Sequence, residues 1–81
     1  MKTKLAAAQD FVMQAKAYNY KKLDMTFEQY IFAVVDRAIK NPKYEAAVKA
    51  VCGYSVKQMR NEILTVAAVH DAVMTAKEEF V

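Results

Sequence analysis

Two matching helix-start signatures constrain the fold of this chain more than any other feature. One is Thr26 followed three residues later by Gln29, and the other is Ser55 followed three residues later by Gln58. The hydroxyl oxygen of the first residue can accept a hydrogen bond from the first helical turn, and the Gln side chain can accept one from the backbone N–H of the capping residue. Gly53, just before the second signature, is suited to ending a helix. The sequence therefore predicts a helix, a tight break and another helix around this glycine.

The spacing of apolar residues extends these signatures into four helices. Apolar residues recur at intervals of three or four, the period of a helix with one buried face. The predicted helices cover residues 4–18, 27–40, 42–52 and 56–79. The stretch from Ile63 to Ala76 is apolar in nearly every direction around its axis, so it must be covered on more than one side. We therefore expect a single all-α domain over residues 1–81, a compact bundle of four helices with the last one long and central.

The same spacing predicts which side chains face the core. The expected inward-facing residues include Leu5 in the first helix and Phe32 in the second. In the third helix they include Tyr44, Val51 and Cys52. The second helix carries apolar residues over more than half of its circumference, so we expect it to be deeply buried.

The sequence offers little for catalysis. His70 beside Asp71 is the one candidate general base, and no nucleophile or metal ligand lies one helical turn away. The simplest interpretation is a satisfied histidine in the core or an interface, the alternative being a pH-sensitive or catalytic role. A single Cys and a single Gly argue against a cysteine-based metal site and against a glycine-rich phosphate loop. We expect a non-enzymatic protein with no catalytic residue, cofactor or metal.

Cysteine usage and hydropathy predict a cytoplasmic protein without a membrane span. One cysteine in 81 residues agrees with a reducing compartment. The N-terminal segment begins with basic and apolar residues, but Gln9 and Asp10 interrupt it before a secretory apolar region forms. The most apolar stretch contains His70 and Asp71 and is shorter than the roughly 20 residues that cross a bilayer.

A surplus of apolar residues predicts a binding surface. Hydrophobic residues make up 56% of the chain, more than a small monomer readily hides from water. We expect a protein partner and a homo-oligomer, a dimer. The expected interface residues are Val66, Val69, His70, Val73 and Phe80. The short chain, rich in Lys, Tyr, Met and Ala, is similar to accessory proteins of tailed bacteriophages, and this resemblance implies a regulatory or adaptor protein that modulates a host or phage protein.

The segment from Glu45 to Met59 gives a second hypothesis. Its short helix, its turn with Gly53 and its capped second helix resemble a DNA-binding helix-turn-helix. The resemblance implies a regulator in which residues 56–62, Val56 to Glu62, begin the recognition helix. The residues that would contact nucleic acid are Lys49, Ser55, Lys57, Gln58, Arg60 and Asn61. This hypothesis requires a continuous positive face and binding that weakens steeply with salt.

Overall fold

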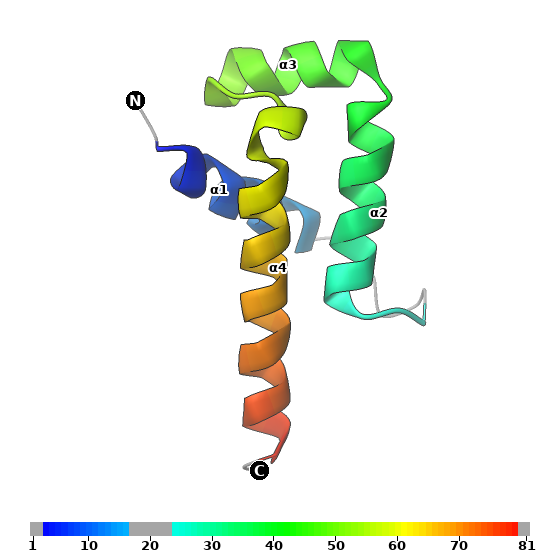
Figure 1. Ribbon diagram of the computed structural model, residues 1–81, viewed down its shortest axis with the longest axis vertical. Coiled ribbons are helices and arrows are strands. Elements are labelled where there is room, and N and C mark those ends of the chain that lie inside the picture. Colours follow the sequence, from blue (N-terminus) through cyan, green and yellow to red (C-terminus); the bar gives the residue numbers. More distant parts are fainter. Residues whose placement is uncertain (1–2, 17–23, 80–81) are drawn as a thin grey trace.

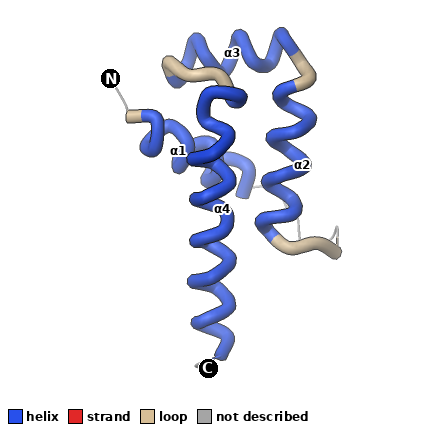
Figure 2. The backbone as a smooth tube through the Cα atoms, in the orientation of Figure 1, coloured by secondary structure: helices blue, strands red, loops and turns tan. Residues whose placement is uncertain are grey.

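Four helices account for nearly all of the described chain. The computed structural model describes residues 3–16 and 24–79. The helices are α1 (Lys4–Lys16), α2 (Phe27–Ile39), α3 (Pro42–Cys52) and α4 (Val56–Glu79) (Figure 1). The described residues contain no strand (Figure 2). The predicted all-α bundle is therefore confirmed, with α4 the longest helix and the one that both α1 and α2 pack against. The predicted end of the first helix, residues 17 and 18, lies outside the described residues.

Both predicted capping boxes form. At α2, the Gln29 N–H donates to the Thr26 hydroxyl over 3.1 Å, and the Thr26 N–H donates to the Gln29 side-chain oxygen over 3.0 Å. At α4, the Gln58 N–H donates to the Ser55 hydroxyl over 3.2 Å, and the Ser55 N–H donates to the Gln58 side chain over 2.8 Å. Gly53 ends α3 in the left-handed conformation at a φ of 87°. The sharp break between α3 and α4 therefore has the local cause that the sequence indicates.

The core lies between the first half of α4 and the two helices packed on it. Val56, Met59, Ile63 and Ala67 of α4 are completely buried. These residues recur every three or four positions, so they form one stripe along the helix. The residues that α1 and α2 add to the core are Ala7, Ala8, Phe11, Val12, Ala15, Phe27, Ile31, Val35 and Ala38.

Several predicted core positions are wrong. Leu5 is 50% exposed, and Ala7, two residues further on, faces the core instead. Phe32 is 52% exposed and lies under the guanidinium of Arg60, whose central carbon is 6.0 Å from the ring centroid. The apolar arc of each helix is wider than the strip that a neighbouring helix covers. Periodicity identifies the arc and not the covered strip.

The prediction of an inner face for α3 is correct only for Val48 and Cys52, and it is wrong for Tyr44 and Val51. None of its residues is buried, Tyr44 is exposed, and Val51 is 86% exposed. Figure 1 gives the reason, because α3 crosses the end of the bundle instead of lying along it. Only Val48 and Cys52 of this helix pack partly against the core. The helix begins at the Asn41 cap and ends at Gly53.

The last turns of α4 extend beyond the other helices (Figure 1). A helix of 24 residues is about 36 Å long. It accounts for most of the longest dimension of the molecule, which measures 42 × 27 × 18 Å. Every residue from Ala72 to Lys77 is exposed. The long helix is therefore central in its first half and uncovered in its last turns.

Candidate protein-binding surface

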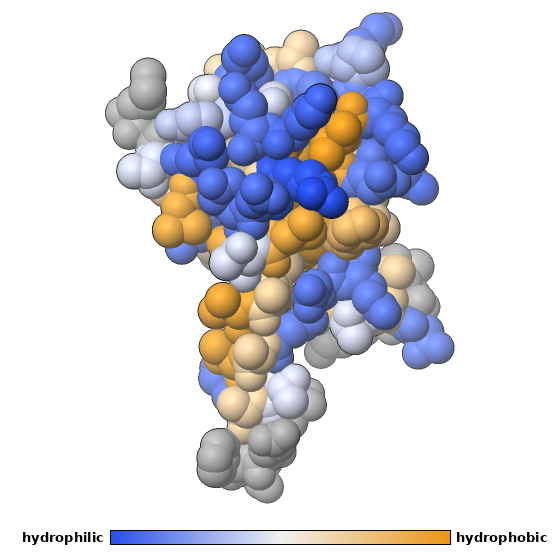
Figure 3. Space-filling view, in the orientation of Figure 1, coloured by the Kyte–Doolittle hydropathy of each residue, from blue (hydrophilic) through white to orange (hydrophobic). Residues whose placement is uncertain are grey.

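Apolar side chains continue along α4 after the core ends. We define the α4 ridge as Val66, Val69, Ala72, Val73 and Ala76. At about 100° per residue, these five positions fall within about 120° of the helix circumference. Figure 3 shows hydrophobic surface gathered along the projecting part of this helix. The ridge lies beside the buried stripe, and its members after Val66 are exposed.

The two central valines of the ridge are open to solvent. Val69 is 57% exposed and Val73 is 49% exposed, whereas Val66 packs partly against the core. Fully burying an exposed valine is worth about 1.5–3 kcal/mol, so a partner that covers the exposed half of both side chains gains about that amount in total. The ridge is also convex and on a rigid helix, which suits contact with another helix.

Of the other predicted interface residues, His70 lies apart from the ridge and Phe80 lies outside the described residues. The His70 ring packs against Phe27 of α2, with 4.5 Å between ring centroids. Its position on α4 falls on the side of the buried stripe. The structure therefore brings Val66, Val69 and Val73 onto one face and directs His70 toward α2.

His70 is packed but its ring nitrogens have no partner among the described residues. Both nitrogens are buried from water without a hydrogen bond. The nearest carboxylate oxygen, on Asp71, is 4.0 Å from Nδ1, too far for a hydrogen bond. Burial lowers the pKa of His70 below 6.5, Lys16 and Lys77 lower it further, and Asp71 opposes them. The imidazole is consequently held in its neutral form at neutral pH. The prediction of a satisfied histidine is correct for the packing of the ring and wrong for its hydrogen bonding.

Asp71 has a structural role that sequence spacing does not reveal. Its carboxylate accepts a hydrogen bond of 3.0 Å from the backbone N–H of Glu28, in the first turn of α2. A negative charge is favourable there because the helix dipole is positive at its N-terminus. Asp71 therefore links α4 to the start of α2, which leaves the pair with His70 without the geometry of a catalytic dyad.

A second carboxylate caps α4 from α3. Glu45 accepts hydrogen bonds from the backbone N–H groups of Val56 over 2.6 Å and Lys57 over 3.1 Å. The start of α4 is the part of a recognition helix that approaches nucleic acid. In this chain a carboxylate occupies that end, and its charge would repel a phosphate.

The six predicted nucleic-acid contacts are spread over the end of α3 and the start of α4. Lys49, Lys57, Gln58, Arg60 and Asn61 are exposed, and Ser55 is half-buried. The side chains of Ser55 and Gln58 are engaged in the capping box. The guanidinium of Arg60 covers the Phe32 ring. The structure thus leaves Lys49, Lys57 and Asn61 as the uncommitted members of this set.

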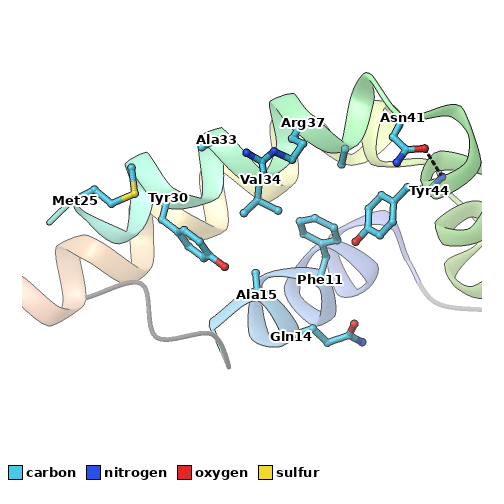
Figure 4. Close-up of a pocket in the computed structure, with 11 residues that line it drawn as sticks. Phe11, Gln14, Ala15, Met25, Tyr30, Ala33, Val34, Arg37, Asn41 and Tyr44 are labelled. Carbon is cyan, nitrogen blue, oxygen red and sulfur yellow. Dashed lines mark hydrogen bonds between the residues drawn. The ribbon is translucent and has the colours of Figure 1, made fainter. Parts of the chain in front are cut away.

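A groove of about 600 Å³ lies between α1 and α2. Figure 4 shows Tyr30 and Val34 of α2 and Tyr44 of α3 directed toward Phe11 of α1. Arg37 stands at the α2 wall and makes no hydrogen bond or ion pair with the described residues. The apolar floor and the polar rim suit an amphipathic side chain. This groove is a second candidate surface for a partner.

The described residues contain no group of three or more His, Cys, Asp or Glu side chains that could hold a metal ion. Cys52 is a free thiol on α3, half-buried beside the core. In the part of the chain that the structure describes, no helix has the length and hydropathy needed to span a bilayer.

The elements define an all-α bundle of four helices with one helix that extends beyond the others. Comparisons of the chain with protein-family models, with curated proteins and with solved structures found no match. The function is therefore inferred from the surfaces of the molecule.

The valines of the ridge are among the predicted interface residues, whereas its alanines count in the sequence only as part of the apolar circumference of the helix. Ala72 and Ala76 are exposed and share the face of Val69 and Val73. Their spacing was visible, because positions 66, 69, 73 and 76 repeat at alternating steps of three and four, the pattern of a coiled-coil seam. The roles of Glu45 and Asp71 had no such signal, since each acts on a helix distant in sequence.

Proposed function

We propose that this chain is a small regulatory or adaptor protein that acts by binding another protein through the α4 ridge, without catalysing a reaction. The observation that carries the proposal is that Val69 and Val73 are each about half exposed on a helix that extends past its own bundle. A chain that leaves apolar side chains on a protruding helix gains from covering them. The resemblance to bacteriophage accessory proteins stays a prediction.

The ridge supports the proposal better than the groove does. Its side chains are apolar throughout, and a helix that protrudes can enter a complementary surface without rearrangement of the bundle. The groove beside Arg37 has several polar groups at its rim. We therefore propose that the partner binds the ridge. A variant of the groove serves as the control in the experiment below.

Quantitative affinity capture from the organism that encodes the chain tests the proposal. The wild-type chain, the Val69→Glu/Val73→Glu variant and the Arg37→Glu variant are each immobilised and compared, with and without nuclease. We expect a protein that the wild type and the Arg37 variant retain, that the ridge variant loses and that nuclease does not release. Its affinity for the purified chain is then measured by calorimetry. Equal retention by the ridge variant would overturn the assignment.

The helix-turn-helix alternative has weaker support. The turn at Gly53 and the exposed Lys49 and Lys57 favour it. The Glu45 carboxylate at the start of α4 counts against it, because DNA phosphates and that charge would compete for the same end of the helix. A fluorescence-anisotropy titration with duplex DNA at two salt concentrations tests this alternative, with Lys57→Ala as the variant. Binding that weakens both with salt and in the variant would favour the DNA-binding function.

A further inference from the structure

We propose that the partner of the α4 ridge is a second copy of this chain, bound with its α4 antiparallel across a twofold axis. The inference rests on the proposed function, because it names the occupant of the same surface. Three features of α4 support it: the repeat of the ridge, the charges at its two ends and the position of the bundle along the helix.

The repeat of the ridge suits a two-helix seam. Val66, Val69, Val73 and Ala76 occupy alternating positions three and four residues apart, the spacing at which two α-helices interlock. In an antiparallel pair centred near residue 71, Val69 meets Val73 of the second copy, and Val66 meets Ala76 of the second copy. The apolar centre of the ridge is therefore complementary to itself when one helix is reversed.

One pair of charges beside the ridge favours the antiparallel direction. Glu62 precedes the ridge on the same side of the helix, and Lys77 flanks its other end. Neither forms an ion pair with the described residues. Reversing the second helix brings each Lys77 to within about one helical turn of the Glu62 of the other copy, twice in the dimer. A parallel pair would instead place Glu62 against Glu62 and Lys77 against Lys77.

The shape of the molecule favours the same direction. The bundle surrounds the first half of α4, and the ridge continues past it (Figures 1 and 3). An antiparallel pair places the two bundles at opposite ends of the seam. A parallel pair would set the two bundles side by side at one end.

Sedimentation equilibrium measures whether the dimer forms through the ridge. We expect the Val69→Glu/Val73→Glu variant to raise the dissociation constant by about 100-fold or more, because two buried apolar contacts are replaced by charges. Val51→Glu, the same change at an exposed valine of α3, is the matched control and should leave the constant unchanged. A wild-type chain that is monomeric at high micromolar concentration would overturn the inference, as would a dimer that the ridge variant leaves intact.

Charge exchange tests the pairing of the two ends. Glu62→Lys and Lys77→Glu should each weaken the dimer by about 3-fold to 10-fold, and the double exchange should restore it. This recovery is specific to the antiparallel pair, because the double exchange leaves a parallel pair with the same repulsions. Failure of the double variant to recover would contradict the pairing.

A distance between the two copies tests the direction itself. A spin label at Lys57→Cys, in a Cys52→Ser background, lies about 14 residues from the centre of the seam. The antiparallel dimer predicts a label separation of about 40 Å, and a parallel dimer predicts about 10 Å. The short distance would overturn the inference. This inference and the proposed function can fail separately. If the chain is strictly monomeric but its ridge still captures another protein, the dimer is ruled out and the proposed function stands.

Discussion

Gly53 ends α3 in a backbone conformation that few other residues adopt easily. Its φ of 87° belongs to the left-handed region, yet nothing lies within 4 Å of a Cβ added there. Gly53→Ala should therefore cost about 1–2 kcal/mol through backbone strain alone, without a steric clash. Urea unfolding monitored by circular dichroism measures this difference. Gly53→Asn is the matched control, and its loss should be smaller because Asn tolerates the left-handed region better. Equal losses would point to another cause.

His70 should make the stability of the fold depend on pH. Its pKa is lowered in the folded chain, chiefly by burial, so the unfolded chain binds more protons below pH 6.5. The free energy of unfolding should accordingly be highest above pH 6.5 and fall as the pH decreases from there toward the lowered pKa. Lys16 and Lys77 face the ring with the same sign as the imidazolium, and Asp71 only partly offsets them.

The test compares wild type with His70→Leu by urea unfolding at several pH values between about 5.5 and 7.5, a range in which histidine is the main titrating side chain. The variant should lose most of the pH dependence. At the upper end its stability should be close to that of the wild type, because removing two unpartnered nitrogens offsets the change in packing. A pH profile that is the same in both proteins would contradict this account.

At the scale of the elements, carboxylates from other helices cap the two helices that build most of the core. Glu45 of α3 binds two N–H groups of α4, and Asp71 of α4 binds one N–H of α2. Glu45→Ala should lower the free energy of unfolding by about 1–3 kcal/mol, because charge-assisted bonds to a helix N-terminus are lost. Glu45→Gln keeps an acceptor without the charge and should lose less. Urea unfolding distinguishes the two variants, and a negligible loss in both would show that the cap contributes little.

The two halves of α4 should respond differently to loss of side-chain volume. Ile63 is completely buried and Val69 is 57% exposed. Ile63→Ala should cost about 2–5 kcal/mol, and Val69→Ala less than about 0.5 kcal/mol in dilute solution. Thermal or urea unfolding at low protein concentration measures both. A large loss at Val69 would mean that the ridge is covered within one molecule.

Local signals in the sequence predicted the elements well and the buried side chains only in part. The caps at Thr26 and Ser55 depend on residues three positions apart, so adjacent sequence determines them. The exposure of Leu5 and Val51 depends on which helix lies nearby, and an apolar period carries no information about that. The link between Glu28 and Asp71 spans 43 positions, for which no sequence pattern exists.

The candidate site likewise combines features that adjacent sequence reveals with features that depend on how the helices pack. Val69 and Val73 were identifiable because an apolar circumference that is too wide must remain partly uncovered. The direction of His70 was not, because it depends on the position of Phe27 on another helix. A binding surface is thus visible in the sequence as an excess of apolar residues, and its limits become visible only once the helices are packed.

For the whole molecule, the ridge predicts stability that varies with concentration. If folded chains pair through α4, mass action raises the midpoint of thermal unfolding as the protein concentration increases. We expect a steady rise in the wild type between about 1 and 100 μM and a constant midpoint in Val69→Glu/Val73→Glu. Differential scanning calorimetry measures both series. A constant midpoint in the wild type would contradict pairing in this range.

The hydrogen bond between Asp71 and Glu28 lies at the level where α4 leaves its bundle. Beyond that point α4 is exposed from Ala72 to Lys77, and this bond joins the first turn of α2 to the base of the exposed part. A partner that tilts the exposed part of α4 would strain this hydrogen bond to the first turn of α2. We therefore expect a partner bound to the exposed part of α4 to affect α2 through this bond, without touching α2 itself.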